Sequence, residues 1–176
     1  VSQVAILYSG DYEWSREENY RFAGMIDAVR MLLRQKIREE AGGTYGVGIG
    51  GSRRRDPYQV YLIQIGFGTD PERVEEITQR LYETLESAKS GALDESFVDR
   101  VTATQREEYQ QNLKENGYWA SALETVVEYG REFSSILDYP ELLDTLTPED
   151  LQDAAAAYLV KSRSLELTLL PASGDG

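Results

Sequence analysis

The sequence contains no histidine and no cysteine among its 176 residues. Without cysteine the chain has no disulfide, no thiolate nucleophile and no thiolate metal ligand. Without histidine it has no imidazole base, no Ser-His-Asp triad and no ordinary zinc site, so any metal would need oxygen ligands. Most hydrolytic chemistry at neutral pH is therefore closed to this chain acting alone.

Positive charge is also scarce, because 18 Lys and Arg stand against 31 Asp and Glu, for a net charge of −13. This balance argues against nucleic acid as a partner, since phosphate affinity depends on Lys and Arg. It also disfavours docking on an anionic membrane surface. No apolar run approaches the ~18 residues of a membrane span. With 41% hydrophobic residues, the chain is nevertheless expected to fold.

The length fits one domain, and we expect a single domain over residues 1–171 followed by a frayed tail at 172–176. The chain begins at Val1 rather than at a methionine, in residues that already have the pattern of a strand. We therefore expect it to be a piece of a longer protein.

Hydrophobic periodicity predicts the order β-α-β-β-α-α-α-α-β. The first helix is expected to begin at a Ser15–Glu18 capping box and to end at the pair Gly42-Gly43. An α+β two-layer sandwich follows, with a mostly antiparallel sheet and helices packed on one face. The strands are expected over 3–9, 44–52, 58–68 and 163–170, and the later helices over 71–90, 94–116, 118–130 and 147–159.

Two glycine- and arginine-rich patterns lie around the expected hairpin. Residues 46–51 satisfy G-x-G-x-x-G, but the dinucleotide fingerprint needs a strand before it and a helix after it. Here a helix precedes and a strand follows, which favours a glycine-rich strand that a ligand backbone or another chain can approach closely. Arg53-Arg54-Arg55 is interpreted as a solvated hairpin tip rather than a phosphate clamp.

Acidic and aromatic clusters offer weaker signals. The acidic pairs lie on the polar faces of the expected helices, and nothing singles one out as a catalytic pair of carboxylates. Tyr118 and Trp119 follow the helix break at Asn116-Gly117. They are expected to fill the gap between the third and fourth helices, although the lining of a ligand cleft stays open as an alternative.

The junction between the first helix and the second strand, residues 37–47, holds the remaining candidates. Arg38 is a cation in the last turns of a helix, where the macrodipole favours it. Tyr45 is by itself an ordinary strand tyrosine. These two residues alone do not indicate catalysis.

The junction resembles the second, non-zinc domain of the pitrilysin (insulinase) family of zinc peptidases. The shared pattern is an Arg near the end of a long helix, a small-residue turn, and a Tyr seven positions later that opens a strand. Arg38 and Tyr45 fit this pattern. The resemblance covers nearly the whole chain, including residues 1–8, 93–95 and 146–151, and is closest to bacterial members.

The resemblance implies a division of labour. The family's catalytic half carries the zinc motif H-x-x-E-H, and its second half closes over the substrate. This chain would then be inactive alone and hold no metal, with zinc expected in the homologous partner domain of the same or another chain. Arg38 and Tyr45 would be catalytic donors that stabilise the transition state. Gly46 and Gly48 would leave room for the peptide substrate.

Two other functions stay open: a catalytically inactive structural or assembly subunit of the same family, and a stand-alone peptide-binding domain. The presence of both Arg38 and Tyr45 favours the active enzyme. The expected partners are the zinc-bearing domain and peptides, without nucleic acid or membrane insertion, and an exposed apolar face would allow a dimer. The sequence leaves the compartment open between bacterial cytoplasm and periplasm.

Overall fold

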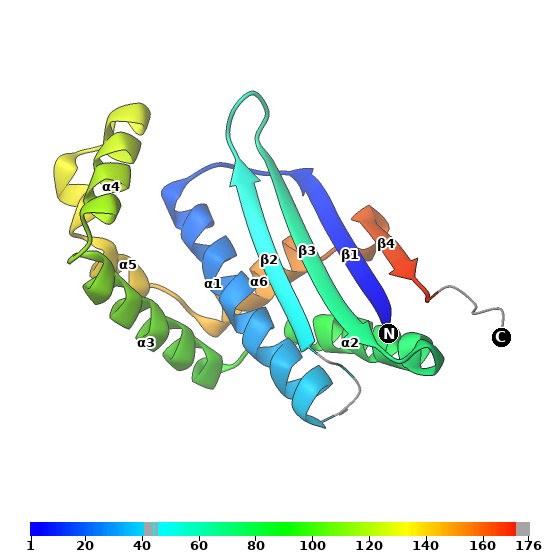
Figure 1. Ribbon diagram of the computed structural model, residues 1–176. Helices are drawn as coiled ribbons and strands as arrows, with labels where there is room; N and C mark the ends of the chain where they lie inside the picture. Colours follow the sequence, from blue (N-terminus) through cyan, green and yellow to red (C-terminus); the bar gives the residue numbers. More distant parts are fainter. Residues whose placement is uncertain (41–43, 45, 172–176) are drawn as a thin grey trace.

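The computed structural model describes residues 1–40, 44 and 46–171, without the side chains of residues 39 and 40. One four-stranded antiparallel sheet, in the order β2-β3-β1-β4, packs against helices (Figure 1), which confirms the predicted α+β sandwich. Its strands are β1 (Ser2–Asp11), β2 (Gly46–Arg54), β3 (Val60–Thr69) and β4 (Ser164–Leu169). The α-helices are α1 (Arg16–Leu33), α2 (Val74–Ala88), α3 (Glu95–Asn112), α4 (Asn116–Tyr129), α5 (Tyr139–Leu143) and α6 (Pro148–Tyr158).

The register of the sheet brings distant parts of the chain to one end. Gly46 of β2 lies opposite Gly68 of β3, which lies opposite Gln3 of β1. Gln3 in turn lies opposite Leu169 of β4. The beginning of β2 and both ends of the described chain therefore lie at the same end of the sheet, with β2 and β4 as its edges.

The two faces of the sheet differ sharply in exposure. Side chains alternate between the faces of a strand, and those directed at the helices are buried. Among these buried side chains are Val4, Ile6, Tyr8, Ile49, Tyr61, Ile63, Ile65 and Phe67. On the opposite face Leu165, Leu167 and Leu169 are about half exposed or more. The open face thus carries an apolar stripe along β4.

Helix α1 is the centre of the core, and its periodic apolar residues are buried against the sheet and α6. The Ser15 hydroxyl accepts from the Glu18 amide at 3.0 Å, as the capping box predicts. The second predicted hydrogen bond of the box, from the Ser15 amide to the Glu18 carboxylate, is wrong. The Glu18 carboxylate instead accepts from the Tyr158 hydroxyl of α6. A tertiary partner has replaced the local one. A complete capping box lies at Thr147 and Asp150, at the start of α6.

Several element boundaries differ from the sequence prediction; α3, for example, ends at Asn112 and not near residue 116. Regular α-helix ends at Leu33, and the chain continues as a seven-residue π-helix, η1 (Arg34–Glu40). The predicted stop at Gly42-Gly43 lies outside the described residues. Strand β2 extends to Arg54, into the predicted loop, because its last residues still pair with Val60 and Tyr61 of β3. No helix in the described part of the chain is both long and apolar enough to cross a membrane.

Candidate functional site

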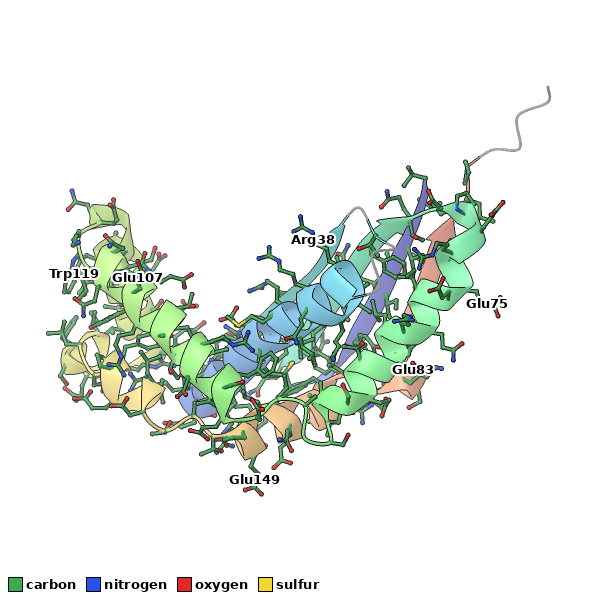
Figure 2. The ribbon with its side chains drawn as sticks, turned by 90° about the horizontal axis from the view of Figure 1, so that it is seen from below. Arg38, Glu75, Glu83, Glu107, Trp119 and Glu149 are labelled. Carbon is green, nitrogen blue, oxygen red and sulfur yellow. The ribbon has the colours of Figure 1, made fainter. Side chains whose placement is uncertain are left out.

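Arg38 lies near the end of η1, directly before the connection to β2. The preceding Ile37 is completely buried and fixes this turn against the core, whereas Arg38 is exposed. Figure 2 shows the Arg38 side chain projecting from the end of the first helix. No hydrogen bond or ion pair joins it to any side chain that the structure describes. Its guanidinium is therefore presented outward, at the end of the sheet where β2 begins.

The second predicted donor, Tyr45, lies outside the described residues. The residues after it form β2, and Gly46 and Gly48 both lie on the open face of the sheet. A Cβ atom built on either glycine would meet nothing within 4 Å. Packing within the domain therefore does not require glycine there, and the surface beside β2 is unobstructed.

The outer edge of β2 has no neighbouring strand in the sheet formed by the described residues. An edge strand presents unpaired backbone N–H and C=O groups, which can pair with another extended chain. The G-x-G-x-x-G pattern lies inside this strand, and β3 rather than a helix follows it. The interpretation of residues 46–51 as a glycine-rich strand is confirmed.

A basic groove near Arg38 was not foreseen from the sequence. A cavity of about 580 Å³ lies between α1 and α3, lined by Arg30, Arg34 and Arg100 together with Asp27 and Glu108. Arg30 pairs with Asp27 at 2.5 Å. The signal that could have indicated it is the four-residue spacing of Arg30, Arg34 and Arg38, which favours one side of a helix. This groove is thus less acidic than the net charge of the chain suggests.

The two aromatic residues after the helix break, Trp119 and Tyr118, both contact the end of α3. The Trp119 indole donates to the Leu113 carbonyl at 2.9 Å and joins α4 to α3, as predicted. Tyr118 packs edge-on against Tyr109 of α3, with ring centroids 6.3 Å apart, and it also lines a cavity beneath α4.

Arg53 contradicts the prediction of a solvated arginine tip. It is half-buried, and its guanidinium lies 5.1 Å from the centroid of the Phe22 ring. The reason is strand alternation, because Ile49, Gly51 and Arg53 all face the helices. Arg54 and Arg55, by contrast, are exposed as predicted.

The described residues can also be tested for side chains that would bind a metal ion. The chain offers only Asp and Glu among strong metal-binding side chains, and no three of them in the described residues are grouped to hold an ion. The residues that the structure describes therefore do not fit the zinc of a peptidase.

Comparisons with known proteins agree with this geometry. A model of the family described as the peptidase M16 inactive domain matches residues 2–104, more than half of the chain. The Haemophilus influenzae protein named "Probable zinc protease PqqL" is 27% identical over 173 residues, which cover 98% of this chain and 18% of that protein. The chain thus spans about a fifth of that relative's length.

Two solved structures share the fold. The periplasmic protease PqqL from Escherichia coli matches with a TM-score of 0.80 and 19% identity, over 97% of this chain and 19% of that one. The inactive peptidase domain of a Bordetella parapertussis protein matches with a TM-score of 0.72 and 20% identity, over 99% of this chain and 93% of that one. A chain of nearly this length is therefore enough to form the fold in that relative.

Proposed function

Because the chain belongs to the peptidase M16 inactive domain family, we propose that it is the substrate-binding and transition-state-stabilising half of a zinc metalloendopeptidase. The zinc centre is assigned to a homologous domain outside these residues, in the same or another chain. The observation that carries the proposal is the position of Arg38. Its exposed guanidinium stands at the start of a glycine-rich edge strand that has open space beside it.

The substrate is proposed to lie along β2 as an extended peptide. Backbone pairing with the free strand edge would hold any sequence, because it uses groups that every peptide carries. Gly46 and Gly48 would let the peptide or the opposing domain come close to the β2 backbone, since they place no side chain on the open face. The scissile region would then lie near the Arg38 end of the strand.

Arg38 and Tyr45 are proposed to stabilise the oxyanion of the tetrahedral intermediate. Arginine stays protonated at neutral pH, and an ordinary tyrosine keeps its hydroxyl proton because its pKa is about 10. Both side chains therefore donate hydrogen bonds where negative charge develops on the carbonyl oxygen. Preorganised donors of this kind each contribute roughly 10²–10³ in rate.

The test compares Arg38→Ala and Tyr45→Phe in the protein that contains the zinc-bearing domain. Each variant is expected to lower kcat by roughly 10²–10³. Since Arg38 is exposed, its variant should unfold within about 0.5 kcal/mol of the parent. Arg80→Ala, which removes an exposed arginine of α2, is the matched control and should retain full activity.

Two outcomes would refute the assignment. Unchanged cleavage by Arg38→Ala would indicate a scaffold or assembly role, which needs no oxyanion donor. A large loss of stability at unchanged specific activity would instead make Arg38 and Tyr45 structural residues. Peptide-cleavage rates and unfolding midpoints, measured on the same preparations, distinguish these results.

A further inference from the structure

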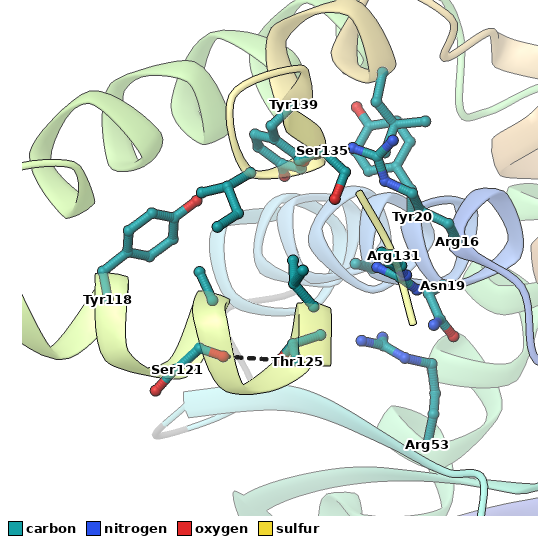
Figure 3. Close-up of a pocket in the computed structure, with 15 residues that line it drawn as sticks. Arg16, Asn19, Tyr20, Arg53, Tyr118, Ser121, Thr125, Arg131, Ser135 and Tyr139 are labelled. Atoms are coloured by element: carbon teal, nitrogen blue, oxygen red, sulfur yellow. Dashed lines mark hydrogen bonds between the residues drawn. The ribbon is translucent and has the colours of Figure 1, made fainter. Parts of the chain in front are cut away.

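A second cavity, far along the sheet from Arg38, has the features of an anion site. It occupies about 430 Å³ between the start of α1 and the segment running from α4 to α5 (Figure 3). Arg16, Arg53 and Arg131 line it, and no Asp or Glu does, although the chain carries 31 acidic residues. The volume falls in the usual range of small-ligand sites.

The fold brings two of these arginines to the cavity by local geometry. Arg53 stands on the helix-facing side of β2, stacked on Phe22, and its buried Nε atom has no hydrogen-bond partner in the described structure. Arg131 follows Gly130, which ends α4 in the left-handed conformation with φ 62°. The Arg131 amide then donates to the Val126 carbonyl at 2.9 Å, so the chain reverses and Arg131 lines the cavity under α4.

The charge of these arginines is only partly neutralised. Arg16 forms an ion pair with Asp138 and also donates to the Ser135 carbonyl at 3.2 Å. Arg53 and Arg131 have no ion pair with any carboxylate that the structure describes. Two arginines at the cavity are therefore without an ion-pair partner among the described residues.

One further donor lies at the same cavity. The Asn19 side-chain oxygen already accepts from the Tyr12 hydroxyl at 2.9 Å, which orients its amide nitrogen as a donor. A buried donor left unpaired is costly, and an acceptor on a ligand would relieve that cost.

The rest of the lining is mainly apolar or aromatic, with the hydroxyl residues Ser121, Thr125 and Ser135 among it. Tyr118 and Val126 of α4 line it, together with Ile136, Tyr139 and Leu142 from the segment that runs to α5. Tyr139 contacts Tyr20 edge-on, with ring centroids 6.0 Å apart, so the two rings form a continuous aromatic wall. A ligand that matches this cavity carries a negative group attached directly to an apolar one.

We infer that the cavity binds the C-terminal residue of a peptide, with its carboxylate on Arg53 and Arg131 and an apolar or aromatic side chain against the tyrosines. The planar guanidinium suits a carboxylate because its N–H donors match the two oxygens. The choice of a peptide among organic carboxylates rests on the proposed function. The site then selects peptides by their free C-terminus and last side chain.

The test measures binding by this 176-residue chain with titration calorimetry. The probe is N-acetyl-Ala-Ala-Phe with a free carboxylate, and its C-terminal amide is the matched ligand without the charge. The free acid should bind at least about tenfold more tightly than the amide, since a hydrogen bond to a charged group is lost. Affinity should also fall as salt is added.

Variants place the binding in this cavity. Arg131→Gln and Arg53→Lys should each weaken the free acid at least about tenfold. Arg53→Lys keeps the positive charge beside Phe22 and removes the planar fork, so it tests geometry rather than charge. Arg54→Gln is the matched control, because Arg54 is the next residue of β2 and is exposed. It should bind as the parent does, and all variants are compared by melting temperature.

Several results would overturn the inference. The proposed carboxylate site would be contradicted by equal binding of acid and amide or by no binding at all. Equal weakening by Arg54→Gln would also contradict it. Equal binding of phenylacetate or inorganic phosphate would show a general anion site instead of a peptide site. These measurements involve no cleavage, so their failure leaves the role of Arg38 untouched, and the loss of that role would leave this binding measurable.

Discussion

Two glycines of β2, three residues apart, should respond to alanine in opposite directions. A Cβ atom on Gly51 would lie 2.7 Å from Cε1 of Phe22 and 2.9 Å from the Ile26 side chain. The Phe22 ring cannot easily retreat, because it is completely buried and contacts the ring of Tyr158 at a centroid distance of 5.1 Å. A Cβ atom on Gly48 would meet nothing within 4 Å.

The expected magnitudes follow from these contacts. Overpacking a filled core costs about 1–3 kcal/mol, and alanine regains about 0.5–1 kcal/mol over glycine inside a strand. Gly51→Ala should therefore lose roughly 0.5–2 kcal/mol of unfolding free energy. That loss lowers the melting temperature by roughly 1–8 °C for a domain of this size. Gly48→Ala should gain up to about 1 kcal/mol, because only the strand preference changes.

Urea unfolding followed by far-ultraviolet circular dichroism measures both variants, with calorimetry as the second probe. The dependence of the unfolding free energy on urea concentration should be the same in the parent and both variants, which shows that stability alone has changed. The reasoning fails if Gly51→Ala is as stable as the parent, or if Gly48→Ala is destabilised equally. A stable Gly48→Ala variant that cleaves peptides more slowly would additionally support the proposed path of the substrate along β2.

Three further predictions concern pH, a buried hydrogen bond and the basic groove. Burial raises the pKa of Tyr82 and of Tyr139 to about 12. Unfolded tyrosine ionises near 10, so their stabilisation is complete below pH 10 and is lost between pH 10 and 12. Urea midpoints across that range check this, and a loss that starts near neutral pH would contradict it. Tyr158→Phe removes the donor to the Glu18 carboxylate and should lower stability by about 1–3 kcal/mol, whereas an unchanged urea midpoint would show the bond to be dispensable. Arg34→Glu should slow cleavage of acidic peptides about tenfold at low salt and leave neutral peptides unaffected, and equal slowing of both would exclude an electrostatic role for the groove.

The sheet and the helices could be predicted because their signals are local. Alternating apolar residues mark β1 and β3, and a stripe every three or four residues marks α1. The π-helical segment could not be predicted, because the buried Ile37 continues the apolar spacing of α1 and gives no local sign of a change in helix type. The partner of Glu18 was missed for a similar reason, since Tyr158 is distant in sequence and becomes available only after α6 packs on α1.

The candidate site likewise contains residues that could be predicted from the sequence and residues that could not. Arg38 and Tyr45 were singled out only by the family resemblance, because an exposed arginine and a strand tyrosine carry no local mark of chemistry. Arg53 was recoverable from strand alternation, which places it on the buried face with Ile49. The arginine cavity could not be predicted, because Arg16, Arg53 and Arg131 come from three segments that only the tertiary fold brings together.

The pairing of β1 with β4 also determines how the domain responds to mechanical force. The two strands are antiparallel, and Gln3 lies opposite Leu169, so the ends of the described chain are neighbours at one edge of the ladder. A load that pulls these ends apart acts across the strands and opens the inter-strand hydrogen bonds one after another. Such unzipping needs far less force than shearing all the bonds together. Tension along the polypeptide therefore detaches β4 first, while the β1–β3–β2 sheet that carries Gly46 and Gly48 remains paired.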